Sequence, residues 1–220
     1  MRKNFFTKKE KNLRDIPTSM YLCTVKNADT RERILGRMFS DIHKYGFQGL
    51  RADKVVAEMD ITKGALYHYF PSKQSIGIAV IDEIIRPHYL AFYRELNQSV
   101  AHPVDLLQGH LQELTGMCTT DSIALGCPLN NLIQEMSPID ETFRVRLKSV
   151  IDTMHQTVAD SLRRGQQSGF IRPDVNPVDT AHFFLATLEG AYGIAKVQKS
   201  VAVFKATLDV LSQFLNTLRK

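Results

Sequence analysis

The chain has 220 residues, of which 44% are hydrophobic, and a formal net charge of +5, so it can bury the core of one large or two small domains. No stretch approaches the ~20 uninterrupted apolar residues of a membrane helix, and the first fifteen residues are too charged for a signal peptide. The cysteines (Cys23, Cys118 and Cys127) are odd in number and widely spaced, which favours a reducing compartment over a disulfide framework. We therefore expect a soluble, cytoplasmic protein.

The positive charge is concentrated at the front of the chain. Residues 1–73 contain 15 Lys and Arg against 8 Asp and Glu, whereas residues 74–220 contain 13 against 15. A basic front end on a mildly acidic body favours binding of a polyanion. The alternative is a solvated basic tail, because residues 1–28 alone carry seven basic and two acidic side chains.

Helical periodicity dominates from about residue 30, with no convincing run of strict alternation. The first helix is expected to begin at Asp29 or Thr30 and to end at Gly46, a residue that accepts the left-handed conformation. A second, short helix follows Leu50. A tight turn at residues 60–61 then leads to a third helix, capped by Thr62 and running to about Tyr69.

The rest of the chain predicts six further helices. Pro71 breaks the chain, Ser72 caps a fourth helix that runs to about Leu96, and Pro87 kinks or splits it. The other five are expected at residues 103–117, 129–136, 138–165, 177–198 and 201–218. The sequence thus predicts an all-α fold of about nine helices, without internal repeats.

The first three helices have the arrangement of a helix-turn-helix, whose last helix lies in the major groove of DNA. Apolar residues are available to fix the third helix against the second: Val55, Val56, Ile61, Leu66 and Phe70. The outward face of the third helix is slim and polar, and it comprises Lys63, Gly64, Ala65, Tyr67 and His68. The hydroxyl of Thr62 and the free backbone N–H groups beside it suit a phosphate.

Residues 61–73, ITKGALYHYFPSK, resemble the signature of the TetR family of transcriptional regulators, and residues 30–60 resemble that family's first two helices. The resemblance implies a helix-turn-helix DNA-binding domain (29–73) and an effector-binding and dimerisation domain (74–220), which follow the basic N-terminal extension (1–28) that the charge distribution indicates. It further implies a homodimer that binds a palindromic operator in double-stranded DNA. Such a protein is most often a repressor that a small molecule, here a largely apolar one, releases from its operator.

The resemblance also assigns DNA contacts. The family positions that match Lys63, Gly64 and Ala65 approach base edges, and those that match Tyr67 and His68 contact bases or backbone. The family position that matches Lys73 binds a DNA phosphate, and the one that matches Arg51 contacts the DNA backbone or a base. Two alternatives stay open: Tyr69 faces the DNA in place of Tyr67, or His68 is simply solvated.

Two positions depart from the family pattern. Asp60 stands where the family usually has glycine, although aspartate tolerates the left-handed conformation better than most residues. Asp53 stands where a polar or basic residue is common. A carboxylate there would repel phosphate, so we expect Asp53 to cap the second helix rather than to contact DNA.

The last two predicted helices provide a dimer interface of the kind the family uses. Small residues at 186, 190 and 193 fall on one face of the first of them, and the second carries an apolar stripe. The expected interface residues are Ala186, Gly190, Gly193, Thr207, Val210, Leu211 and Phe214. The alternative is that these faces pack only within one subunit.

An effector pocket is expected among the helices of the body. Its candidate residues are Phe92, Met117, Cys118, Leu129, Met154, Phe184, Glu189 and Tyr192, and each of the apolar ones is equally suited to the core. Glu189 is an acid on an otherwise apolar helix. It either orients a polar or cationic group of the effector, or pairs with Lys196 or with water.

Cys127 is a candidate sensor thiol, because a similar glycine-cysteine pair in some family members senses electrophiles. It precedes a predicted helix start, where the helix dipole lowers the pKa of a thiol. The alternative is a buried structural cysteine, since no basic residue lies within five positions of it.

Enzymatic activity is not expected, because HExxH, Walker A, GxSxG and dinucleotide glycine motifs are absent. His102 and His110 are a weak metal pairing, and neither a metal nor a cofactor is expected. The alternative function is that of a helical small-molecule carrier without operator-specific DNA binding. Substitution of Lys63 and Lys73 distinguishes the two.

Overall fold

The computed structural model describes residues 29–220, which are helical apart from turns, loops and one isolated bridge between Ile171 and Arg219. The expected all-α class is confirmed for this part of the chain. None of its helices combines the length and the apolar character that crossing a membrane requires. The basic N-terminal extension predicted for residues 1–28 lies outside the described residues.

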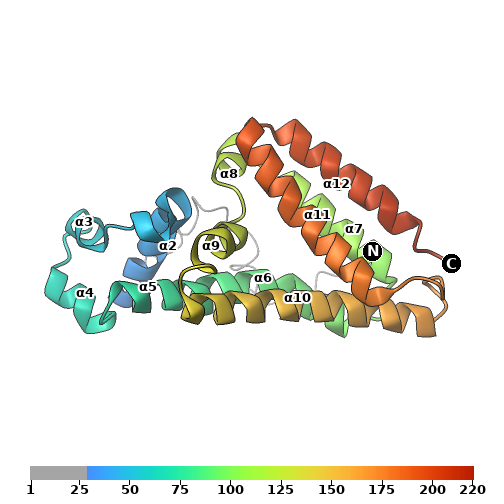
Figure 1. Ribbon diagram of the computed structural model, residues 1–220, viewed down its shortest axis with the longest axis horizontal. Coiled ribbons are helices and arrows are strands. Elements are labelled where there is room, and N and C mark those ends of the chain that lie inside the picture. Colours follow the sequence, from blue (N-terminus) through green and yellow to red (C-terminus); the bar gives the residue numbers. More distant parts are fainter. Residues whose placement is uncertain (1–28) are drawn as a thin grey trace, which may run out of the picture. The chain divides into compact units, whose positions relative to one another are not determined.

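The N-terminal unit ends at His88, later than the expected boundary at residue 73. It contains α2 (Thr30–Gly49), α3 (Ala52–Ala57), α4 (Lys63–Tyr69), α5 (Lys73–Ala79) and a π-helical segment η1 (Val80–Ile85) (Figure 1). The boundary moves because α5 and η1 pack against α2 and so share its core. That core is formed by apolar side chains that are at most 5% exposed, namely Ile34, Leu35, Met38, Phe39, Ile42, Val55, Val56, Leu66, Phe70, Ile76, Val80 and Ile81.

Gly46 ends the first regular helix within α2, as predicted from the sequence. Its backbone angles (φ 79°, ψ 164°) lie in a region that L side chains rarely adopt. The chain then makes one further helical turn to Gly49, which brings Phe47 into the core with 8% of its surface exposed. The predicted end at Gly46 is therefore confirmed, and residues 47–49 form a separate short turn within α2.

The predicted disturbance at Pro87 takes the form of the π-helical segment η1. Proline lacks the N–H group that an α-helix needs and its ring crowds the preceding turn, so wider hydrogen bonding before it relieves the clash. Arg86 accordingly donates its N–H to the carbonyl of Ile81, five residues back. Beyond η1 the chain continues as α6 (Arg86–Gln98), which runs from the N-terminal unit into the second.

The C-terminal unit, residues 89–220, adds six helices to the end of α6. They are α7 (Pro103–Met117), α8 (Thr120–Leu125), α9 (Pro128–Met136), α10 (Glu141–Gln167), α11 (Pro177–Gln198) and α12 (Val201–Asn216). Three of them begin at the prolines that mark them in the sequence, where the missing N–H costs nothing. The short α8 was not predicted, although Thr119 and Ser122 form a capping box at its start.

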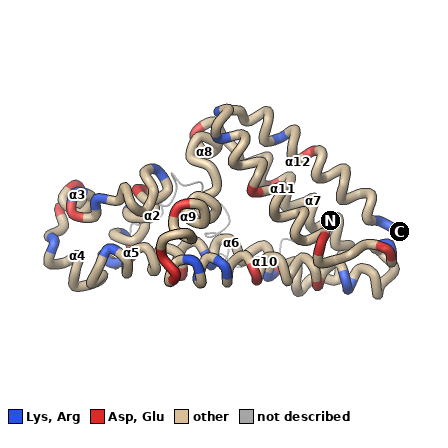
Figure 2. Tube along the Cα trace, in the orientation of Figure 1, with Lys and Arg blue, Asp and Glu red and all other residues tan. Residues whose placement is uncertain are grey.

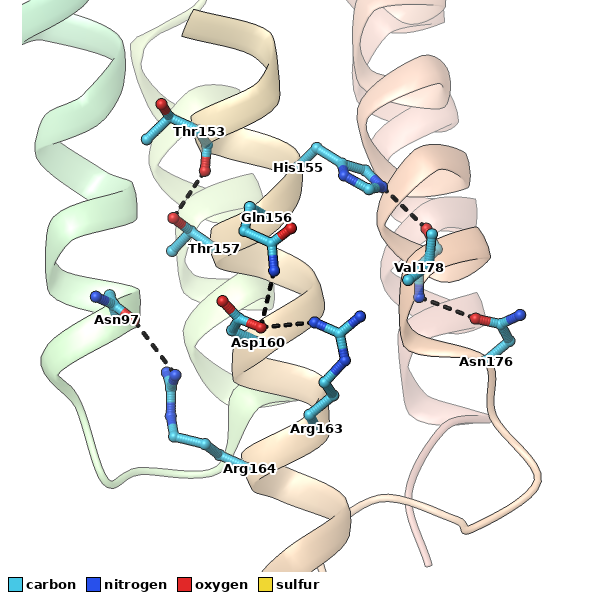
Figure 3. Close-up of polar contacts among 10 residues, drawn as sticks. All are labelled: Asn97, Thr153, His155, Gln156, Thr157, Asp160, Arg163, Arg164, Asn176 and Val178. Carbon is cyan, nitrogen blue, oxygen red and sulfur yellow. Dashed lines mark hydrogen bonds and ion pairs between the residues drawn. The ribbon is translucent and has the colours of Figure 1, made fainter. Parts of the chain in front are cut away.

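Within this unit α11 packs between α10 and α12, and α12 also packs against α7 (Figure 1). Polar contacts join the helices at several points (Figure 3). The Nε2 atom of His155 on α10 lies 3.1 Å from the carbonyl oxygen of Val178 on α11. The guanidinium of Arg164 donates to Asn97 Oδ1 (3.3 Å) and to the carbonyl of Leu96 (3.0 Å), which fixes the end of α6 to α10.

Candidate DNA interface and effector site

Helix α4 presents a polar face to solvent while one apolar side chain anchors it. Leu66 is completely buried, whereas Tyr67 is 44% exposed and Lys63, Gly64 and His68 are also exposed. Tyr69 is only partly buried and its ring meets His68 edge-on, with centroids 5.3 Å apart. Of the two tyrosines considered for DNA contact, Tyr67 is thus the one that points outward.

The turn between α3 and α4 sets the direction of α4. Asp60 adopts φ 56°, so aspartate does occupy the left-handed conformation at this turn. The N–H of Ile61 donates to the carbonyl of Val56 (2.9 Å), which closes the turn. Thr62 then caps α4 by accepting the N–H of Ala65 (3.2 Å) at its hydroxyl oxygen. Together with the buried Val55, Val56, Leu66 and Phe70, these contacts hold α4 as the sequence predicts.

Asp53 does not cap α3, and the expectation that it would do so is wrong. The residue before α3 is Arg51, and no side chain caps that helix. The Asp53 carboxylate instead lies 2.7 Å from the Nζ of Lys63 and accepts a hydrogen bond from the Tyr67 hydroxyl (3.3 Å). The hydrogen bond from Lys63 lowers the pKa of Asp53 below its usual value. Acidic and basic positions accordingly lie together on α3, beside the basic position at the start of α4 (Figure 2).

Lys73 is folded onto α2 rather than extended into solvent. Its Nζ donates to the carbonyl of Gln48 (2.9 Å) and lies 5.2 Å from the centre of the Phe47 ring. The capping box formed by Ser72 and Ser75 fixes the start of α5 beside it. Arg51 is exposed at the start of α3. Lys73 therefore makes a structural contact within the N-terminal unit.

In the C-terminal unit, five polar side chains form a group that we call the acid–tyrosine cluster: Tyr89, Tyr93, Cys127, Glu189 and Tyr192. They come from α6, from the residue that precedes α9, and from α11. The Tyr89 hydroxyl lies 3.0 Å from Cys127 Sγ, and the Glu189 carboxyl also forms a hydrogen bond with that thiol. Burial raises the pKa of Glu189 to about 7.

Cys127 is a buried thiol with a raised pKa, which contradicts the expected activation by the helix dipole. Only 2% of its surface is exposed, and burial together with the charge of Glu189 raises its pKa well above the usual value. The hydrogen bonds from Tyr89 and from the N–H of Asn130 (3.3 Å) act in the opposite direction but are weaker. The thiol thus stays protonated at neutral pH, and the structural alternative is the better description of it.

The other predicted effector residues lie in different surroundings. Leu129, Met154 and Phe184 are at most 1% exposed and belong to the core. Met117 is 47% exposed at the end of α7, and Cys118 donates its S–H to the carbonyl of Thr115.

Two further contacts bear on the effector residues. Phe92 stacks on the ring of His110 with centroids 3.7 Å apart. Lys196 does not pair with Glu189: its Nζ donates to Asn131 Oδ1 (3.1 Å).

The expected interface residues of α11 lie on an exposed face. Ala186, Gly190 and Gly193 are exposed, and a Cβ atom built on either glycine would meet nothing within 4 Å. Large apolar side chains beside them are exposed too, namely Phe183 (48%), Ile194 (54%), Val197 (77%) and Val210 (64%). Few charged residues interrupt α11 and α12 (Figure 2).

The expected interface residues of α12 differ in their exposure to solvent. Val210 is exposed, while Thr207 and Phe214 are partly buried. The Phe214 ring meets that of Phe183 edge-on with centroids 4.7 Å apart, which joins the two helices on this face. Leu211 is only 1% exposed and packs inside the subunit, so its assignment to the interface is wrong. We call the exposed residues Phe183, Ala186, Gly190, Gly193, Ile194, Val197 and Val210 the α11–α12 face.

Comparison with known proteins agrees with these features. Residues 42–80 match the family model for bacterial regulatory proteins of the tetR family, and residues 103–211 match that for the C-terminal domain of tetracyclin repressor-like proteins. A helix-turn-helix followed by such a helical domain defines a DNA-binding transcriptional regulator. The chain belongs to the TetR family.

Similar proteins include an uncharacterized HTH-type transcriptional regulator of Lactococcus lactis, 27% identical over 187 residues, or 83% of this chain and 91% of the relative. The HTH-type transcriptional repressor NemR of Escherichia coli is 24% identical over 78% of this chain and 86% of its own length. The solved structure of a TetR transcriptional regulator from Chloroflexus aurantiacus has a TM-score of 0.74 at 23% identity, covering 86% of this chain and 96% of its own.

Proposed function

We propose that the chain is a homodimeric repressor that reads operator DNA with α4 and leaves it when a small molecule binds the C-terminal unit. The observation that carries the proposal is the polar face of α4, where Lys63, Tyr67 and His68 are exposed on a helix anchored by Leu66. Such a helix enters the major groove and contacts base edges. The remaining contacts are proposed to come from Arg51, Thr62, Gly64, Ala65 and Lys73.

A dimer follows from the exposed α11–α12 face. Small residues at 186, 190 and 193 allow a second helix to approach closely, and the apolar side chains around them gain by burial. Two copies related by a two-fold axis present two α4 helices, and a spacing of about 34 Å between them fits successive major grooves. The operator is therefore proposed to be palindromic.

Release by an effector requires only a modest coupling between the two sites. A ligand that prefers a conformer with the wrong spacing of the two α4 helices lowers operator affinity about ten- to a hundredfold at a coupling of about 1.4 to 2.7 kcal/mol. The acid–tyrosine cluster is the proposed place of effector binding. The alternative of a carrier that no longer reads DNA predicts ligand binding without any sequence-specific DNA binding.

The test begins with selection of duplexes from a random library by the purified protein. Lys63→Ala is expected to weaken binding to the selected duplex about tenfold or more, because a base contact and a charge are lost. Lys73→Ala is expected to weaken selected and random duplexes alike. Lys148→Ala, which removes an exposed lysine of α10, is the control and should bind as the parent does. Enrichment of no sequence by the parent protein would favour the carrier.

A further inference from the structure

Two polar atoms in the acid–tyrosine cluster are buried without a hydrogen-bond partner. Glu189 Oε2 and the Tyr93 hydroxyl are both inaccessible to solvent, and neither has a partner within residues 29–220. Tyr93 as a whole is only 2% exposed. A buried polar group left without a partner costs about 1–3 kcal/mol, so native proteins keep very few of them. Two such atoms in one cluster indicate that something from outside the chain satisfies them.

The Tyr89 hydroxyl and the Cys127 thiol of the cluster already have partners. Cys127 Sγ contacts the Tyr89 hydroxyl at 3.0 Å and accepts the N–H of Asn130 at 3.3 Å. The side chain of Asn130 reaches the backbone carbonyl of Glu189 at 3.5 Å, which ties α9 to α11 at this level. The second carboxyl oxygen of Glu189 and the Tyr93 hydroxyl are thus left to bind a ligand.

No cation of the described chain compensates the Glu189 carboxyl. Lys196, on the same helix, donates to Asn131 instead. The hydroxyls of Tyr89, Tyr93 and Tyr192 and the thiol of Cys127 are coupled electrostatically to Glu189. The cluster therefore contains a single acid, several aromatic rings and no positive charge.

This composition discriminates between ligands by charge. An anion would place a second negative charge beside a buried carboxyl, where the low dielectric makes repulsion strong. A cation is attracted both by the carboxylate and by the negative faces of aromatic rings. A neutral donor gains the hydrogen bond but not the charge interaction.

We propose that the effector is a protonated amine with a compact apolar body, whose N–H group donates to Glu189 Oε2 beside the Tyr93 hydroxyl. This inference rests on the proposed function, because it gives the chemical class of the effector that the C-terminal unit binds. Both atoms that the amine contacts come from the C-terminal unit, on α6 and α11. The body of the ligand is then free to contact apolar side chains such as Phe92 and Tyr192.

Three probes of nearly equal shape test the charge preference directly. Calorimetric titration of the full-length protein with 2-phenylethylamine, 2-phenylethanol and phenylacetate is expected to show the amine binding about tenfold or more tighter than the alcohol. Phenylacetate should bind weakest. A failure of the amine to bind, or a preference for the alcohol or the anion, would overturn the proposal and leave water as the partner of the two atoms.

Two variants test whether the preference for the amine arises at the acid–tyrosine cluster. Glu189→Gln keeps a hydrogen-bond acceptor but loses the charge, and it is expected to reduce the difference between amine and alcohol to less than about threefold. Glu113→Gln, at an exposed position of α7, is the matched control and should keep the preference of the parent. An unchanged preference in Glu189→Gln would place the amine elsewhere and contradict the assignment.

Operator binding without ligand separates this inference from the function on which it rests. If the parent binds its selected duplex but no probe shows the charge preference, only the effector class is wrong. If the parent binds no duplex specifically, the repressor proposal fails, while a charge preference that Glu189→Gln abolishes still supports the amine site.

Discussion

Asp53 and Lys63 form an ion pair of 2.7 Å between the two helices of the helix-turn-helix, α3 and α4. The pair is exposed, with 68% of the Lys63 side chain and 45% of the Asp53 side chain accessible, so it contributes little to stability. The pair instead fixes the positions of two side chains. The Asp53 carboxylate holds the ammonium group of Lys63 and accepts a hydrogen bond from the Tyr67 hydroxyl, so it orients both side chains on the exposed face of α4. If Lys63 contacts DNA as proposed, the DNA competes with this carboxylate for the ammonium group.

Asp53→Asn is expected to raise the affinity for random-sequence DNA several-fold. The substitution removes a negative charge that faces the phosphates and frees Lys63 to contact them, so the salt dependence of binding steepens by about one counterion. Fluorescence anisotropy with a random duplex over a range of salt concentrations measures both effects. Discrimination between selected and random duplex should fall, because Lys63 and Tyr67 are no longer held in place.

Asp60→Asn is the control for this charge change. Asp60 lies in the same domain, and asparagine tolerates its left-handed backbone conformation. If Asp60→Asn and Asp53→Asn raise random binding equally and neither alters discrimination, net charge alone explains the result and the positional role of Asp53 is wrong.

The sequence predicted the turn before α4 and the caps of α4 and α5 well, because local rules decide them. Thr62 and Ser72 cap their helices as expected, and Asp60 adopts the left-handed turn. Proline marks three helix starts correctly for the same local reason. The pairing of Asp53 was missed, because it depends on the distance across the turn to Lys63 and not on neighbours in sequence.

Gly190→Leu is expected to convert the protein from dimer to monomer. A Cβ at this position meets nothing within 4 Å in the single subunit, so the larger side chain fits the monomer and obstructs only a second copy. Sedimentation velocity should show that the dissociation constant of the variant dimer is at least about a hundredfold higher than that of the parent dimer. Operator binding should be lost in parallel. Gly116→Leu, an equally open glycine on α7, should remain dimeric. A dimeric Gly190→Leu would exclude this face as the interface.

Gly165→Ala is expected to destabilise the C-terminal unit. The added methyl group would lie 2.6 Å from Ile171 Cγ1 and 2.8 Å from Pro103 Cγ, which is closer than atoms pack. We expect a loss of about 1–3 kcal/mol in the free energy of unfolding, measured by chemical denaturation. Gly116→Ala has open space and should be neutral or stabilising by up to about 1 kcal/mol. Equal stabilities of the two variants would show that the loop at residue 171 yields freely.

Glu189 makes stability depend on pH. Its pKa is about 7 in the folded chain against 4.5 in the reference state, so the folded chain keeps the proton while the unfolded chain loses it. The free energy of unfolding therefore falls as pH rises between these values, by about 3 kcal/mol at most. The tyrosines and Cys127 have raised pKa values and stay protonated over this range.

Glu189→Gln removes this dependence. It is expected to exceed the parent in the free energy of unfolding by about 1–3 kcal/mol near pH 8 and to differ little near pH 4.5, as followed by denaturation at each pH. Glu113→Gln should track the parent throughout, since its carboxyl is exposed. A stability difference for Glu189→Gln that does not change with pH would contradict the buried, proton-binding carboxyl.

The acid–tyrosine cluster was only partly predictable from the sequence. Glu189 was singled out because an acid on an apolar helix is unusual, and Tyr192 was one of the apolar candidates for an effector pocket. Tyr89 and Tyr93 were missed, since on an amphipathic helix a tyrosine is indistinguishable from a surface or core residue until its partners are known. Leu211 was assigned to the wrong face of α12 for a similar reason. The apolar stripe of α12 is wider than the part of it that other helices cover, and only the packing shows which of its residues are buried.

Methylation interference on a selected duplex determines whether a symmetric pair of α4 helices binds in two major grooves. The methyl group added to guanine N7 lies in the major groove, where Lys63 and its neighbours are proposed to bind. Interference is expected in two symmetric half-sites separated by about one helical turn or a multiple of it, and Lys63→Ala should weaken the signal. Interference at a single unsymmetric site, or none at any guanine of a specifically bound duplex, would contradict it.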